Sequence, residues 1–75
     1  MQKIININPN ILGGTPVFQG TRVPVKNLID YIEGGETIDD FLKGFPSVTK
    51  EQVLELLKIA GKVITSDKFI HENIN

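Results

Sequence analysis

Apolar residues recur at helical spacing from Val25 onward, which predicts helices over most of the chain. The first predicted helix covers Val25–Glu33 and ends at Gly34-Gly35, where one glycine can supply the left-handed residue that closes a helix. The second runs from Thr37 to about Lys43, and the third from Thr49 to Ile64. The breaks between them are short.

The third predicted helix has the strongest signals for where it begins. Thr49 and Gln52 have the spacing of a capping box, and Val48 and Val53 have the spacing of a hydrophobic staple. Thr37 is a similar N-cap candidate for the second helix. One wide apolar face is predicted along the third helix, made of Val53, Leu56, Leu57, Ala60, Val63 and Ile64. The opposite side carries Glu51, Glu55, Lys58 and Lys62.

The first 24 residues combine apolar alternation with turn formers, which predicts a small β element. Residues 3–6 predict one short strand and Pro16–Phe18 a second. After a tight turn at Gln19–Thr21, Arg22-Val23 is expected to pair back as a third strand. Ile11-Leu12 is expected to return into the core.

These elements predict one mainly α domain over residues 1–75. It divides into a β and turn segment (1–24), a three-helix bundle (25–64) and a C-terminal tail (65–75). Two helices joined by a short break behind a first helix follow the helix-turn-helix plan. The tail carries apolar residues, so we expect it to dock on its own domain or on a partner.

A chain of 75 residues buries a limited core, and the absence of cysteine excludes disulfides and cysteine-bearing zinc sites. A homodimer or another partner is therefore expected. An edge strand near Val17 or within residues 1–6 is the expected place for a twin to pair. No apolar run approaches the roughly 20 residues of a membrane span. We expect a cytoplasmic protein with no membrane partner.

Charge bears on nucleic-acid binding. The net charge is −1, with one arginine against seven lysines, which disfavours strong phosphate binding by an isolated monomer. A dimer that clusters its lysines stays open. If the third helix is a recognition helix, the candidate DNA-binding residues are Ser47, Thr49, Lys50, Lys58, Lys62 and Lys43. Two glutamates near the start of that helix repel phosphate, so a structural or protein-binding role is the stronger expectation.

The turn around Arg22 supplies the candidates for a partner contact or a structural anchor, namely Arg22, Thr21 and Gly20. A guanidinium can fork onto a phosphate or a partner's carboxylate. It can equally pair internally, with Asp30 or Asp40, and tie the β segment to the helices. The internal pair is the favoured interpretation.

No arrangement of residues points to catalysis. The two serines have no base nearby in sequence, and Asp39-Asp40 is explained by its place at a helix start. His71 is the sole histidine and has no partner at ligand spacing. We expect no catalytic residue, no cofactor and no metal ion.

A set of short motifs lies between residues 13 and 60. They are Gly13, Gly14 and Pro16; Gly20 to Val25; Gly34 and Gly35; Phe45 and Pro46; and Thr49. In this set, and over nearly two-thirds of its length, the chain resembles the family called domain of unknown function 433.

That resemblance implies a homeodomain-like helix-turn-helix fold with a small N-terminal β-hairpin. Many family members are encoded beside a PIN-like ribonuclease and are taken to be antitoxins of the VapB kind. The resemblance therefore implies that this chain binds and silences a PIN-like toxin and represses its own operon through DNA. The alternative is a stand-alone helix-turn-helix transcriptional regulator.

Overall fold

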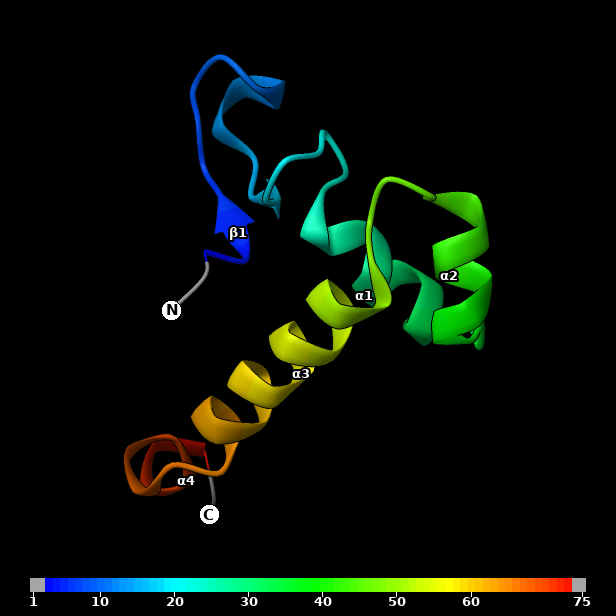
Figure 1. Ribbon diagram of the computed structural model, residues 1–75. Helices are drawn as coiled ribbons and strands as arrows, with labels where there is room; N and C mark the ends of the chain where they lie inside the picture. The colour runs from blue at the N-terminus through cyan, green and yellow to red at the C-terminus, as the bar shows by residue number, and fades with distance from the viewer. Residues whose placement is uncertain (1–2, 74–75) are drawn as a thin grey trace.

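The computed structural model describes residues 3–73 (Figure 1). Within them the chain is mainly helical with a small antiparallel β-hairpin, which confirms the predicted fold class. The elements, in chain order, are β1 (Ile5–Asn6), the 3₁₀ helix η1 (Leu12–Gly14), β2 (Val17–Phe18), α1 (Val25–Glu33), α2 (Ile38–Gly44), α3 (Lys50–Ile64) and α4 (Asp67–Asn73). Part of the predicted N-terminal edge, Met1 and Gln2, lies outside the described residues.

β1 and β2 pair antiparallel, with Ile5 opposite Phe18. The third strand predicted at Arg22-Val23 does not form, and only an isolated bridge joins Val17 to Pro24. The pairing stops there because α1 begins at the residue after Pro24, which also has no N–H to donate to a ladder.

The prediction that Leu12 returns into the core was wrong. Leu12 is 48% exposed, while Ile11 is half-buried. The backbone of Leu12, Gly13 and Gly14 has φ values of 48°, 65° and 92°. This left-handed run turns the chain before the Leu12 side chain can reach the core.

α1 ends in a Schellman motif, as the two glycines predicted. The Glu36 N–H donates to the Tyr31 carbonyl at 2.9 Å, and the Gly35 N–H donates to the Ile32 carbonyl at 3.0 Å. Gly35 has φ of 85°, the left-handed conformation that this motif needs.

α2 and α3 each begin with a capping box. The Thr49 hydroxyl accepts from the Gln52 N–H at 3.1 Å, and Gln52 Oε1 accepts from the Thr49 N–H at 3.0 Å, as predicted. At α2 the predicted N-cap, Thr37, forms the same reciprocal pair with Asp40. The two threonines therefore fix where the chain enters each helix.

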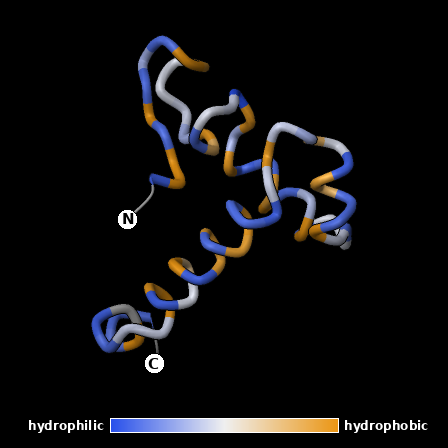
Figure 2. The backbone as a smooth tube through the Cα atoms, viewed as in Figure 1, coloured by the Kyte–Doolittle hydropathy of each residue, from blue (hydrophilic) through white to orange (hydrophobic). Residues whose placement is uncertain are grey.

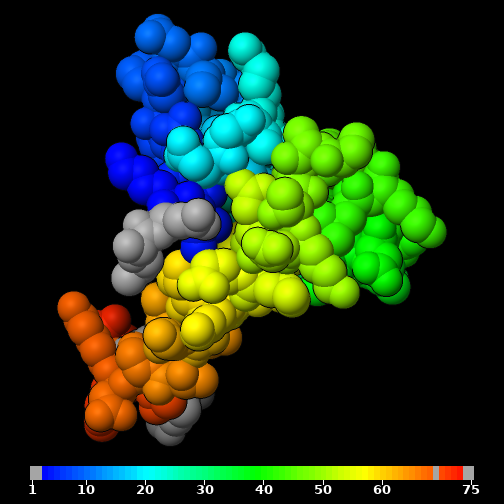
Figure 3. All heavy atoms as spheres, in the orientation of Figure 1, coloured from blue at the N-terminus to red at the C-terminus, as the bar shows by residue number. Residues whose placement is uncertain are grey.

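α3 continues well past the bundle that its first turns join. In Figure 1 it runs away from α1 and α2, and α4 lies beside its far end. Apolar and polar residues follow one another along its whole length in Figure 2. In the space-filling view the end of α3 and α4 project from the body of the molecule (Figure 3).

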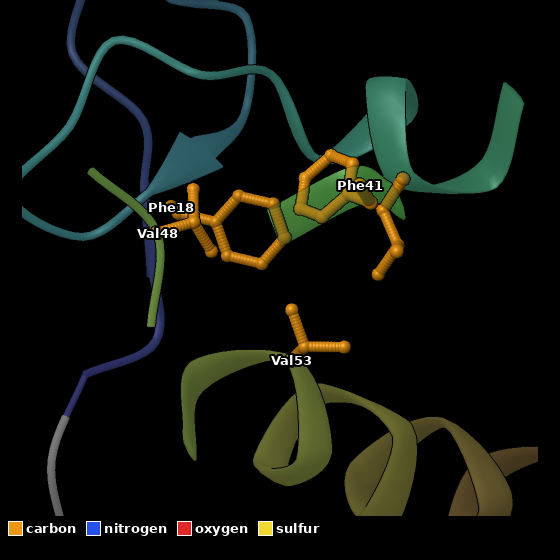
Figure 4. Packing of buried hydrophobic residues seen from close by; sticks show 5 residues of the cluster. Phe18, Phe41, Val48 and Val53 are labelled. Atoms are coloured by element: carbon orange, nitrogen blue, oxygen red, sulfur yellow. The ribbon is translucent and has the colours of Figure 1, made fainter. Parts of the chain in front are cut away.

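The core gathers side chains from β2, α1, α2, α3 and the turn before α3. Its buried members are Phe18 from β2, Leu28 from α1, Phe41 from α2, Val48 from the α2–α3 turn and Val53 from α3 (Figure 4). The rings of Tyr31 and Phe45 stand 5.5 and 5.0 Å from that of Phe41. Val48 and Val53, predicted as a hydrophobic staple, are both in this cluster. The core therefore holds the chain on either side of the α3 N-cap.

Candidate functional site

The turn after β2 is held rigidly by its own residues. Gly20 has φ of 78°, in the region that glycine adopts readily. The Thr21 hydroxyl donates to the Phe18 carbonyl at 2.8 Å and accepts from the Val23 N–H at 3.0 Å. Gly20 and Thr21 thus serve the turn itself.

Arg22 lies exposed on this turn. Among residues 3–73 it makes no hydrogen bond and no ion pair, so the favoured internal pair with Asp30 or Asp40 was wrong. Lys26 Nζ lies 2.9 Å from the Asp30 carboxylate, one helical turn away, and this local pair forms without any loop having to fold against α1. Asp40 is engaged by Thr37.

Two pKa values in this region are shifted, that of Lys26 by Asp30 and that of Asp40 by Thr37. The hydrogen bond and charge of Asp30 raise the pKa of Lys26. The backbone N–H of Thr37, and then its hydroxyl, lower the pKa of Asp40 below its ordinary value. Both groups are used locally, which leaves the Arg22 guanidinium available to another molecule.

A hydrogen bond joins the Arg22 turn to the start of α3. Gln52 Nε2 donates to the Gln19 carbonyl at 2.9 Å. A groove runs along the same junction, lined by Lys3, Ile4, Gln19, Thr49, Glu51, Gln52 and Glu55. The turn and the first turns of α3 therefore form one supported surface.

The candidate DNA-binding residues are all exposed, but they do not form one group on the fold. Lys43 ends α2, Ser47 lies in the turn, and Thr49, Lys50, Lys58 and Lys62 follow on α3 or at its cap. The Thr49 hydroxyl is already used by the capping box. At 3.6 residues per turn, Lys58 and Lys62 share a face with Glu51 and Glu55. Carboxylates therefore interrupt the positive charge that would meet a phosphate backbone.

No described group resembles a metal site. Residues 3–73 contain no cluster of three or more His, Cys, Asp or Glu side chains that could hold an ion. His71 lies exposed on α4. None of the helices in this part of the chain has the length and apolar character to cross a bilayer.

The exposed part of the apolar face of α3 forms a second surface, which the sequence did not single out. The apolar face of α3 was predicted, but its second half lies outside the core, where Leu57, Val63 and Ile64 are exposed. Helix length could have indicated that part of α3 lies outside the core, because α3 has 15 residues whereas α1 and α2 have 9 and 7. Helices that short cover only the first turns of α3.

Comparison with known proteins gives two matches. A family described as Protein of unknown function (DUF433) matches residues 5–60. The chain is also 38% identical, over 52 residues, to Uncharacterized protein y4eO of Sinorhizobium fredii (strain NBRC 101917 / NGR234). That stretch is 69% of this chain and 24% of the relative, so the chain spans about a quarter of the curated protein it matches. No solved structure matches the chain significantly.

Proposed function

The chain belongs to the DUF433 family, and on that premise we propose that it is an antitoxin-like binding protein that neutralises a PIN-like ribonuclease in the cytoplasm. The choice of toxin follows from the family resemblance, because many members of the family are encoded beside a PIN-like ribonuclease. The observation that carries the proposal is the exposed Arg22, which makes no hydrogen bond or ion pair among residues 3–73 and lies on a turn that the Thr21 hydroxyl holds.

A guanidinium presented in this way suits intermolecular recognition. Its planar fork donates two parallel hydrogen bonds to a carboxylate or a phosphate. The Thr21 hydrogen bonds and the Gln52–Gln19 contact fix the backbone beneath it, so little backbone order has to be gained on binding.

Charge favours a protein partner over DNA as the main target. The chain has a net charge of −1, and carboxylates interleave with the lysines of α3. A partner protein can complement such a mixed surface, whereas a phosphate backbone is repelled by its acidic half. In this proposal the chain acts by binding the toxin and catalyses no reaction itself.

The test is co-expression with a PIN-like ribonuclease encoded beside this chain. Tagged wild-type protein should retain the ribonuclease and suppress its activity. Arg22→Ala should weaken retention at least about tenfold, because the partner's group is left unpaired. Arg22→Lys should recover only part of the loss, since an ammonium lacks the fork.

Lys43→Ala is the matched control, because it removes one exposed cation elsewhere on the surface. It should leave retention unchanged. A wild-type chain that neither retains nor inhibits the ribonuclease would remove the proposal. Equal effects of Arg22→Ala and Lys43→Ala would remove Arg22 from it.

The alternative is a stand-alone transcriptional regulator, and the helix-turn-helix arrangement of α2 and α3 supports it. Lys50 lies exposed at the start of α3, where recognition helices contact bases, and Ser47 lies exposed in the turn before it. Binding to upstream DNA would weaken steeply with salt, and Lys50→Ala would reduce the slope. If the DNA is not retained even at low salt, the regulator role and operon repression both fail.

A further inference from the structure

Large aliphatic side chains lie exposed along the second half of α3 and on α4. We call residues 54–73 the arm; its far part, the end of α3 and α4, projects in Figure 3. Its exposed aliphatic residues are Leu54, Leu57, Ile59, Val63, Ile64 and Ile70, each between 37% and 55% exposed. Side chains of this size, grouped on one segment, mark a contact surface.

The apolar side chains cover most of the circumference of the arm's first helix. Placed at 3.6 residues per turn, the aliphatic residues of α3 leave only the sector of Glu55, Lys58 and Lys62 polar. A helix that is apolar on most sides is a buried helix. α4 lies beside the end of α3, yet Val63 and Ile64 next to it stay more than half exposed.

The chain as a whole exposes more surface than a compact monomer of its mass. A monomer of 8.3 kDa exposes about 4,600 Å² by the scaling of surface with mass, whereas this chain exposes 5662 Å². The radius of gyration is 13.7 Å, against about 11 Å for a compact chain of this length. The excess surface, about 1,100 Å², slightly exceeds the 800 Å² or so that each partner buries in a standard interface.

We infer that a second copy of this chain covers the arm, so that the two α3–α4 arms pack together around a two-fold axis. The exposed stripe is continuous with Val53 of the core and with Leu56, which packs against the core, so the arm of a second copy would extend each core. Ala60 lies near the middle of the exposed stretch 54–64, and its small side chain lets two helices approach closely. The edge of β1, by contrast, offers the backbone of two residues.

This inference stands apart from toxin or DNA binding, and it concerns only how two copies meet. In a two-fold interface the same patch serves both chains, and a residue near the axis faces its own copy. Ala60 is therefore the position expected near the axis. Lys58 faces the polar sector and is expected to lie away from the twin.

Sedimentation equilibrium of the full chain over a wide concentration range is the first test. The wild type should have twice the mass of one chain. Val63→Asp should raise the dimer dissociation constant at least about tenfold, because it places a charge in an apolar contact. Lys62→Asp is the matched control, since it puts the same residue one position away, near the same helix end. It should leave the dimer nearly unchanged.

Cross-linking tests the same interface without depending on how Val63→Asp folds. The chain has no cysteine, so a single introduced one reports cleanly. On oxidation Ala60→Cys should yield mostly disulfide-linked dimer, and Lys58→Cys several-fold less. A wild type that stays monomeric at every concentration overturns the inference. Equal cross-linking at the two positions overturns it as well. A dimer that is weakened by a substitution at Ile5 but not by Val63→Asp also overturns it, because the two copies would then meet through β1.

Discussion

Gln52 donates a 2.9 Å hydrogen bond to the carbonyl of Gln19, 33 positions earlier in the chain. The same side chain accepts from the Thr49 N–H and so completes the capping box of α3. One glutamine therefore both caps the N-terminus of α3 and links α3 by a hydrogen bond to the turn that carries Arg22. This double use couples the orientation of α3 to the candidate binding surface.

Substitutions at Gln52 can separate its two contacts. Gln52→Glu keeps an oxygen for the Thr49 N–H but loses the donor to Gln19, so we expect a loss of about 1 kcal/mol in the free energy of unfolding. Gln52→Ala loses both contacts and should cost about 2 kcal/mol. Urea unfolding followed by circular dichroism measures both. A Glu variant as stable as the wild type would mean that the Gln19 contact adds nothing.

The hydroxyl of Thr21 is expected to be what holds the Arg22 turn. Thr21→Val keeps the shape but removes both hydrogen bonds, to Phe18 and from Val23, and should lower the free energy of unfolding by about 1–2 kcal/mol. Thr21→Ser keeps the hydroxyl and should lose well under half of that. Thermal unfolding of the pair checks the difference. Equal losses would show that the methyl packing, not the hydroxyl, stabilises the turn.

Features set by neighbouring residues could be predicted from the sequence. The capping box of Thr49, the glycine end of α1 and the helix over Val25–Glu33 each depend on residues within about one turn of each other. The staple of Val48 and Val53 reached one step further and placed both residues in the core. Local spacing therefore predicted α1, α2 and α3, whereas α4 lies in the segment that was expected to be a tail.

Features that depend on distant segments could not be predicted. The i, i+4 spacing of Lys26 and Asp30 is visible in the sequence, but whether Arg22 reaches Asp30 depends on the position of the turn relative to α1, which is a tertiary property. Nor does periodicity separate the half of α3 that the bundle covers from the half that it leaves exposed. The Gln52–Gln19 hydrogen bond joins α3 to the turn after β2, and no spacing of neighbouring residues predicts it.

Acid should weaken α2 through Asp40. Its pKa in the folded chain lies below the ordinary 3.8, because the Thr37 N–H and hydroxyl favour the carboxylate. A lowered folded pKa stabilises the fold above the ordinary value, and that contribution is lost as pH falls through the folded pKa. Asp40→Asn should therefore unfold more easily than the wild type at neutral pH, and the difference should shrink below pH 3.8.

Thermal unfolding at a series of pH values between neutral and strongly acidic measures this difference. Asp39→Asn is the matched control, because Asp39 lies in the same first turn of α2 but makes none of these hydrogen bonds. A pH-independent gap between Asp40→Asn and the wild type would rule out the titration of this carboxylate as its cause.

Two glycines should respond to alanine in opposite directions. Gly35 has φ of 85° in the Schellman motif, so Gly35→Ala forces a left-handed alanine and should cost about 1–2 kcal/mol. Gly61 lies inside α3, and a Cβ there meets nothing within 4 Å. Gly61→Ala should therefore raise the free energy of unfolding by about 1 kcal/mol, the difference in helix propensity. Urea unfolding at low protein concentration measures both, and a loss at Gly61 would mean that the space beside it is filled when the chain is alone.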